Sequence, residues 1–207
     1  MDKKIILITG GIWYIWSHAV VAFEQSGYKT VIVDNLDNSC LSTYRNIWEI
    51  LGYKPDFYEI DLRDKEKLNE IFKKYKFDWV LHFAWLKAVG ESCEKPLHYF
   101  DNNVVGSLRL FELMQEYSVK NIIFSSSATV YDWEIYENTD FSWALETDKI
   151  WNTSNPYGTT KFLLENILND LSKFSKFNVK IRISKLFSPS NRCLFYFWFF
   201  NDLFQLI

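Results

Sequence analysis

Short apolar runs alternate with amphipathic segments along most of this chain, and this alternation constrains the fold more than any other feature. Runs typical of buried strands cover residues 5–9, 30–34, 57–61, 79–84, 121–126 and 178–183. Apolar residues at helical spacing follow four of them, over residues 15–26, 64–76, 97–117 and 156–171. Strands that are separated by helices pair in parallel, with helices on both faces of the sheet. The sequence therefore predicts an α/β, doubly wound parallel sheet.

Size and charge exclude several classes of protein. The chain has 207 residues, is 48% hydrophobic and carries a net charge of -3, so we expect one globular domain and no nucleic-acid or membrane partner. Cys40, Cys93 and Cys193 lack metal-ligand spacing and predict free thiols in a reducing compartment. The first apolar run is too short for a signal peptide. We expect a cytoplasmic protein without a bound metal.

A turn that contains glycine follows the first predicted strand. Gly10 and Gly11 lie between this strand and the first predicted helix, and Asp34 ends the second strand 24 positions after Gly10. Such a turn directs backbone N–H groups at a pyrophosphate, and an acidic residue at that distance accepts hydrogen bonds from the ribose of NAD. The pattern indicates a Rossmann-like domain that binds NAD.

A second group of polar residues surrounds the fifth predicted strand. The sequence SSSATVY (125–131) ends that strand, and NPYGTTK (155–161) opens the next helix. Tyr157 and Lys161 are four residues apart and share a helix face. An ammonium group close to the phenol would lower the phenol's pKa, and a serine hydroxyl could bind both phenol and substrate. This set predicts a base for an alcohol proton during hydride transfer.

Several longer stretches carry a more specific resemblance. They are VDNLDNS (33–39), DLRD (61–64), HFAWLKAVGESCEKPLHYFDNNVVGSLRL (82–110), VKNIIFSSSATVY (119–131) and NPYGTTK (155–161). On these motifs the chain resembles the extended short-chain dehydrogenase/reductase family, and within it the group of UDP-glucose 4-epimerases. The resemblance covers the chain to about Pro189. Dehydratases of the family place an acidic residue just after the serine, where this chain has Ala128 and Thr129, which argues against dehydration.

The resemblance implies an activity and a set of site residues. The activity is interconversion of UDP-galactose and UDP-glucose with NAD as cofactor, in a protein that could be a homodimer. Tyr157 would be the base, Lys161 its electrostatic partner and Ser127 the residue that binds the substrate hydroxyl. The implied cofactor and sugar contacts are Gly10, Gly11, Tyr14, Ile15, Asp34, Asn35, Asn38, Ser39, Asp61, Leu62, Phe83, Ala84, Lys87 and Asn102.

Three tryptophans depart from the family pattern. Trp13, Trp16 and Trp85 stand where the family has glycine, and the chain has 9 Trp but only 7 Gly. About 14 glycines are typical of a chain this long, at ~7% of residues. An indole in the turn would occupy pyrophosphate space, and a Cβ disfavours any position with positive φ. One hypothesis is that glycine codons of the source organism are translated here as Trp. The alternative is a diverged sequence or a pseudogene.

The end of the chain is a second departure. We expect an NAD-binding domain over residues 1–190 and an atypical aromatic tail over 191–207, without the family's smaller C-terminal substrate domain. A frameshift near residue 184 would produce such a tail. Two further interpretations remain open: another NAD-dependent nucleotide-sugar epimerase or decarboxylase, and a non-catalytic fragment of an NAD-binding domain.

Overall fold

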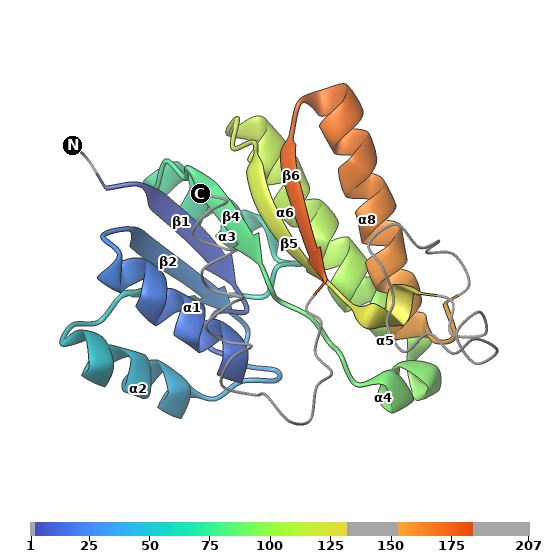
Figure 1. The fold of residues 1–207 in the computed structure, drawn as a ribbon, viewed down its shortest axis with the longest axis horizontal. Coiled ribbons are helices and arrows are strands. Elements are labelled where there is room, and N and C mark those ends of the chain that lie inside the picture. Colours follow the sequence, from blue (N-terminus) through green and yellow to red (C-terminus); the bar gives the residue numbers. More distant parts are fainter. Residues whose placement is uncertain (1–2, 132–152, 184–207) are drawn as a thin grey trace, which may run out of the picture.

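The computed structural model describes residues 3–131 and 153–183, and it contains all six predicted strands (Figure 1). They are β1 (Ile5–Thr9), β2 (Lys29–Asp34), β3 (Asp56–Glu59), β4 (Trp79–His82), β5 (Asn121–Ser126) and β6 (Asn178–Ile183). The strand order is β3-β2-β1-β4-β5-β6, and every neighbouring pair is parallel. The predicted doubly wound sheet is confirmed. The proposed tail over 191–207 and the boundary at residue 190 lie outside the described residues.

The helices agree with the sequence only in part. Three predicted segments become α1 (Tyr14–Gln25), α3 (Lys65–Lys74) and α8 (Pro156–Ser175). The segment predicted over 97–117 consists of α5 (Pro96–Tyr99), a π-helix η1 (Phe100–Val105) and α6 (Gly106–Glu116). Helices α2 (Leu41–Leu51) and α4 (Val89–Glu94) were not predicted, and a 3₁₀ turn η2 (Ala128–Val130) follows β5.

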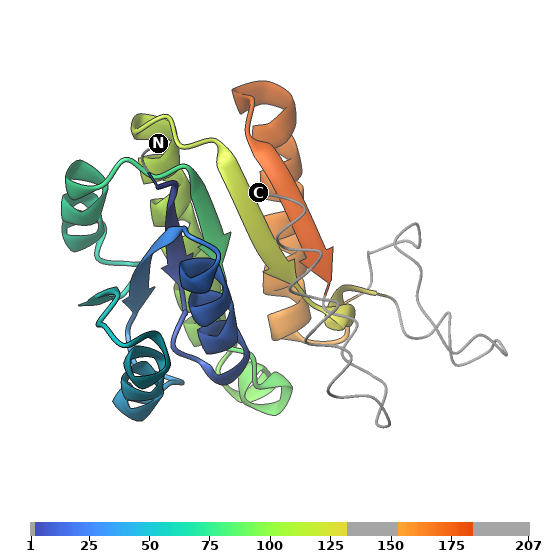
Figure 2. The ribbon, with the colours of Figure 1, turned by 60° about the vertical axis from the view of Figure 1, so that its left-hand side comes forward.

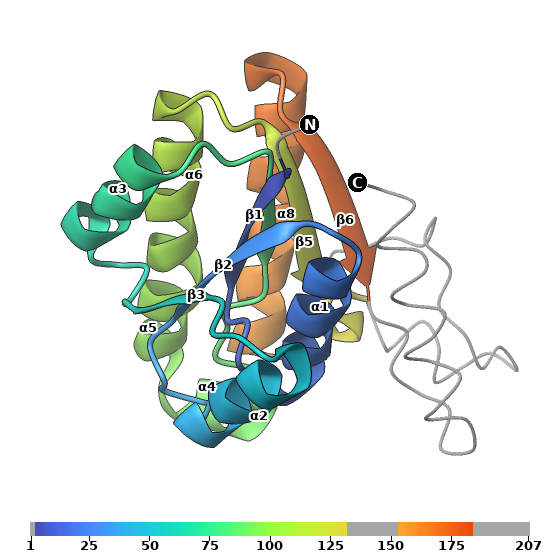
Figure 3. The ribbon, with the colours of Figure 1, turned by 90° about the vertical axis from the view of Figure 1, so that its left-hand side faces the viewer.

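Helices cover both faces of the sheet (Figures 2 and 3). On one face, Ile6 and Ile8 of β1 join the apolar cluster that α1 and α2 complete. On the other face, Leu7 joins the cluster that α3, α6 and α8 complete. Successive strand residues alternate between the two clusters because side chains of a strand point to opposite faces. The four inner strands β1, β2, β4 and β5 are largely apolar because both of their faces are buried, which explains why the sequence predicted them well.

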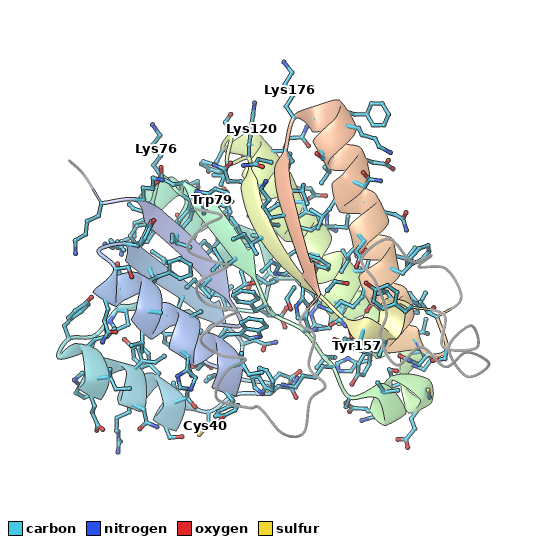
Figure 4. All side chains as sticks on the ribbon, viewed as in Figure 1. Cys40, Lys76, Trp79, Lys120, Tyr157 and Lys176 are labelled. Atoms are coloured by element: carbon cyan, nitrogen blue, oxygen red, sulfur yellow. The ribbon has the colours of Figure 1, made fainter. Side chains whose placement is uncertain are left out.

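The parallel order brings the carboxyl ends of all the strands to one edge of the sheet. Figure 4 places Tyr157 close to this edge, at the opposite end of the molecule from Lys76, Lys120 and Lys176. Between β1 and β4 the strand order reverses direction. In open α/β sheets, ligands bind in the crevice outside the carboxyl ends of the strands at such a reversal.

Candidate active site

A cavity of about 350 Å³ lies at the carboxyl edge of the sheet. It collects residues that are far apart in the sequence, at the ends of β1 to β5 and on α1, η1 and α8. Most of the predicted site residues line it, namely Gly10, Ile15, Asp34, Asn35, Asn38, Ser39, Leu62, Phe83, Ala84, Lys87, Asn102, Ser127, Tyr157 and Lys161. The fold therefore brings the two groups of residues singled out in the sequence to one place.

Three predicted residues lie outside this cavity. A Cβ on Gly11 would lie 3.0 Å from methyl groups of Ile8 and Ile32, so Gly11 serves the packing of the turn on the core. The Tyr14 side chain is 62% exposed, and the predicted backbone contact of this residue stays a prediction. Asp61 lies in an adjoining hollow, where its ion pair with Arg63 lowers the pKa of its carboxyl to about 2.

The turn after β1 requires glycine at its first position. Gly10 has a φ of +71°, and a Cβ there would lie 2.7 Å from the backbone nitrogen of Ala84. Asp34 fixes the neighbouring loop, because its carboxylate accepts hydrogen bonds from the Ser39 hydroxyl at 2.6 Å and the Leu36 amide at 3.0 Å. Asp34 is buried and lines the cavity, as expected for a residue that would meet a ribose.

The three unexpected tryptophans all line the same cavity. The Trp16 indole stacks on the ring of Phe83 with centroids 3.7 Å apart and planes 3° from parallel. The Lys87 ammonium lies 2.7 Å from the centroid of the Trp13 ring, and burial lowers the pKa of Lys87 to about 8. The indoles of Trp13 and Trp16 thus crowd the cavity wall beside the glycine turn.

The backbone argument against tryptophan is wrong at two of these positions. Trp13 caps α1 with φ -76° and ψ 151°, which any residue adopts, and Trp16 lies within α1 itself. Neither position requires a positive φ, so the conflict with a cofactor is one of space and not of backbone strain.

The proposed reaction residues meet after β5. Lys161 is 1% exposed, donates a hydrogen bond to the Ser125 carbonyl at 2.7 Å and lies 5.9 Å from the ring centroid of Tyr157. Trp85 covers this ammonium, with its ring centroid 3.2 Å from Nζ. The expected lowering of the Tyr157 pKa is wrong for this structure. Burial raises that pKa and outweighs the opposing hydrogen bond with Ser127.

Local sequence explains how α8 presents Tyr157. Asn155 caps the helix, because its side chain accepts a hydrogen bond from the Gly158 amide at 2.8 Å, and Pro156 occupies the first helical position. A Cβ on Gly158 would lie 2.6 Å from the Thr129 carbonyl oxygen. Gly158 therefore lets the start of α8 approach the segment that carries Ser127.

Sequence reasoning missed Asn103, which is fully buried in the π-helix η1. Its side chain accepts a hydrogen bond from the Leu86 amide and donates one to the Leu86 carbonyl, both at 2.9 Å. It also donates to the Thr160 hydroxyl at 3.2 Å. Asn103 thus ties the loop that carries Trp85 and Lys87 to the helix that carries Lys161. The pair of asparagines in DNNVV was the available signal.

The described part of the chain has neither a group of metal-binding side chains nor a membrane-spanning helix. Residues 3–131 and 153–183 hold no cluster of His, Cys, Asp or Glu that could bind a metal. Within the same residues, no helix is both long and apolar enough to cross a membrane.

Known proteins resemble this chain over most of its length. A curated UDP-glucose 4-epimerase 2 of Arabidopsis thaliana is 42% identical over 193 residues, which are 90% of this chain and 52% of that protein. A UDP-glucose 4-epimerase of Yersinia enterocolitica is 48% identical over 81% of this chain and 48% of its own length. The chain therefore spans about half the length of the curated relatives it matches.

A solved structure shows the same similarity. The UDP-glucose 4-epimerase of Bifidobacterium longum, in complex with NAD+ and UDP, aligns with a TM-score of 0.79 at 37% identity, over 86% of this chain and 52% of that one. The sequence model described as the NAD dependent epimerase/dehydratase family matches residues 6–196. The chain belongs to this family.

Proposed function

We propose that the protein to which this chain belongs interconverts UDP-galactose and UDP-glucose, with NAD as its cofactor. One observation carries the proposal: Ser127, Tyr157 and Lys161 meet at the end of β5 in a cavity that Gly10 and Asp34 also line. The similarity to UDP-glucose 4-epimerases supports the same activity. Because the chain spans about half of those relatives, the proposal concerns the whole protein.

The residues present fit NAD at two ends of the cavity. Asp34, Asn35, Asn38 and Ser39 would hold the adenosine ribose, and Lys161 would reach the ribose at the reaction end. Gly10 lies so close to the backbone of Ala84 that it has no room for a side chain, and the first position of the turn after β1 stays open. When bound, NAD supplies a reversible hydride acceptor for C4′ of the sugar.

The chain's own residues would handle the proton. The Tyr157 phenolate would take the proton of the 4′-hydroxyl and return it after the sugar has turned in the site. Ser127 would hold the same hydroxyl, because its hydrogen bond with Tyr157 places it beside the phenol. Lys161 would stabilise the phenolate by its charge. Since burial raises the Tyr157 pKa, turnover should rise with pH through the ionisation of this phenol.

A second candidate is a non-catalytic form of the same domain. The indoles of Trp13 and Trp16 line the part of the cavity where the turn would meet a pyrophosphate. This crowding favours a chain that, with tryptophan at these positions, binds NAD poorly. Another nucleotide-sugar epimerase or decarboxylase is a further alternative, which an assay with several UDP-sugars would separate. We also propose a cytoplasmic protein, which could act as a homodimer.

The test of function starts from the coding DNA. The codons at positions 13, 16 and 85 and the reading frame after residue 184 are read from it. The protein that this DNA encodes is then expressed with glycine at the three positions. This protein should convert UDP-galactose to UDP-glucose. Tyr157→Phe should keep NAD binding and lose roughly 10²–10⁴-fold in turnover, as is typical for a positioned general base.

The outcome that contradicts the assignment is near-normal turnover by Tyr157→Phe, which would require a base elsewhere. A pH–rate profile of the unmodified protein is the second measurement. Its activity should fall as the pH decreases, because the protonated phenol cannot accept the hydroxyl proton. Activity that does not change with pH through the ionisation of the Tyr157 phenol would also count against Tyr157 as the base.

A further inference from the structure

Lys161 is a deeply buried lysine. Its side chain is 1% exposed, and Nζ donates a hydrogen bond to the neutral Ser125 carbonyl. The rings of Trp85 and Phe124 lie 3.2 and 5.0 Å from Nζ and carry no net charge. A buried ammonium loses its hydration energy and, in the absence of a carboxylate, tends to release its proton. The role of Lys161 as a charge partner of Tyr157 therefore depends on a compensating group.

Glu165 lies one helical turn after Lys161, on the same face of α8. It is 7% exposed, and its carboxylate accepts a hydrogen bond from the Ser126 hydroxyl. Lys161 and Glu165 thus bind two consecutive residues at the end of β5, one through the Ser125 carbonyl and the other through the Ser126 hydroxyl. Both side chains are therefore buried against the end of β5, one helical turn apart on α8 and next to the residue that precedes Ser127.

The other titratable groups near Lys161 do not supply a negative charge. His82 of β4 is fully buried, and burial together with the charge of Lys161 lowers its pKa well below the usual value, so the ring is neutral. Tyr157 on α8 is a neutral phenol at neutral pH, because burial raises its pKa. Burial lowers the pKa of Lys161 well below its usual value, and the charge of Glu165 opposes that effect in part. Burial raises the pKa of Glu165, against the hydrogen bond from Ser126 and the charge of Lys161.

We propose that Glu165 is a positioning residue, which favours the charged form of Lys161 and holds the end of β5 in place through Ser126. This rests on the proposed function, since it explains how the ammonium remains available to Tyr157. Glu165 itself does not touch the substrate in this proposal. Its carboxylate acts through Lys161, and its hydrogen bond acts through the strand.

The test measures the protonation of Lys161 directly in the chain of residues 1–207. Lysine is labelled with ¹³C at Cε, the Lys161 signal is assigned by its loss in Lys161→Arg, and the signal is followed as a function of pH. Glu165→Gln keeps the size and hydrogen-bonding capacity of the side chain but removes its charge. We expect it to raise the acid dissociation constant of Lys161 at least about tenfold, equivalent to about one pH unit.

Asp170→Asn is the matched control, because Asp170 is an exposed acidic residue of the same helix. It removes one negative charge and should leave the Lys161 titration unchanged. An equal effect of both variants, or no effect of Glu165→Gln, would overturn the proposal. If Glu165→Gln does not fold, the titration of the unmodified chain still tests the proposal. Its Lys161 signal should report the protonation of Glu165 as the pH falls, and a signal without that step refutes the pairing.

This measurement requires neither bound NAD nor turnover. A failed titration would therefore reject the role of Glu165 while leaving the proposed epimerase activity untouched. A complete protein without epimerase activity would reject the proposed function and leave the titration result standing.

Discussion

At the scale of single residues, the three tryptophans decide what the cavity can hold. Gly10 shows what the turn tolerates, since even a Cβ there would lie 2.7 Å from the backbone of Phe83 and Ala84. Trp13 and Trp16 adopt ordinary backbone conformations and pack their rings against Lys87 and Phe83. The fold therefore accommodates the indoles, and the conflict falls on the ligand. The hypothesis of glycine codons translated as tryptophan stays a prediction, which the coding DNA tests.

The first prediction follows from this conflict. Replacing both Trp13 and Trp16 by glycine should strengthen NAD binding more than tenfold, or about 1.4 kcal/mol, because it frees the space beside the turn. Calorimetric titration of NAD into both chains measures the difference. Trp48→Ala is the control, since Trp48 lies on α2 outside the cavity and its loss should leave the affinity unchanged. Equal affinities of the double variant and the original chain would contradict the steric argument.

At the scale of elements, the helical segment from Pro96 to Glu116 does more than cover the sheet. Its π-helix η1 carries the buried Asn103, whose side chain binds both polar groups of the Leu86 backbone. The backbone carbonyl of Asn103 also accepts a hydrogen bond from the Ser107 hydroxyl. That hydroxyl is hydrogen-bonded to the ring of His82 of β4 as well. A buried polar chain thus connects the end of the sheet with the loop that carries Lys87.

A second prediction tests this connection. Asn103→Leu preserves the approximate volume but leaves the buried amide and carbonyl of Leu86 unpaired, each at a cost of about 1–3 kcal/mol. We expect a loss of about 2–4 kcal/mol in the free energy of unfolding, measured by urea denaturation. Asn166→Leu on the exposed face of α8 is the control and should change stability by about 0.5 kcal/mol or less. Similar losses in the two variants would show that Asn103 does not clamp the loop.

At the scale of the whole molecule, the sequence predicted the alternating strands and missed elements and residues whose place depends on distant contacts. Strands β1, β2, β4 and β5 were predictable because each is a largely apolar run buried on both faces. Helix α2 was not, because it begins without a side-chain cap and buries fully only Ile47. The predicted site residues mostly reached one cavity because parallel strands end at one edge. Asn103 and Glu165 escaped because their partners, Leu86 and Ser126, are distant in sequence.

The last prediction concerns how much of the reaction this domain can perform. The chain spans about half of its curated relatives, and its described residues build the side of the cavity that holds Ser127, Tyr157 and Lys161. Holding a substrate in a reactive orientation can contribute about 7–11 kcal/mol to the lowering of a barrier. Residues 1–207 with glycine at positions 13, 16 and 85 should therefore bind NAD but show no measurable conversion of UDP-galactose to UDP-glucose. NAD binding by calorimetry is the internal control for a folded site, and robust turnover by this chain would show that one domain is enough to orient the sugar.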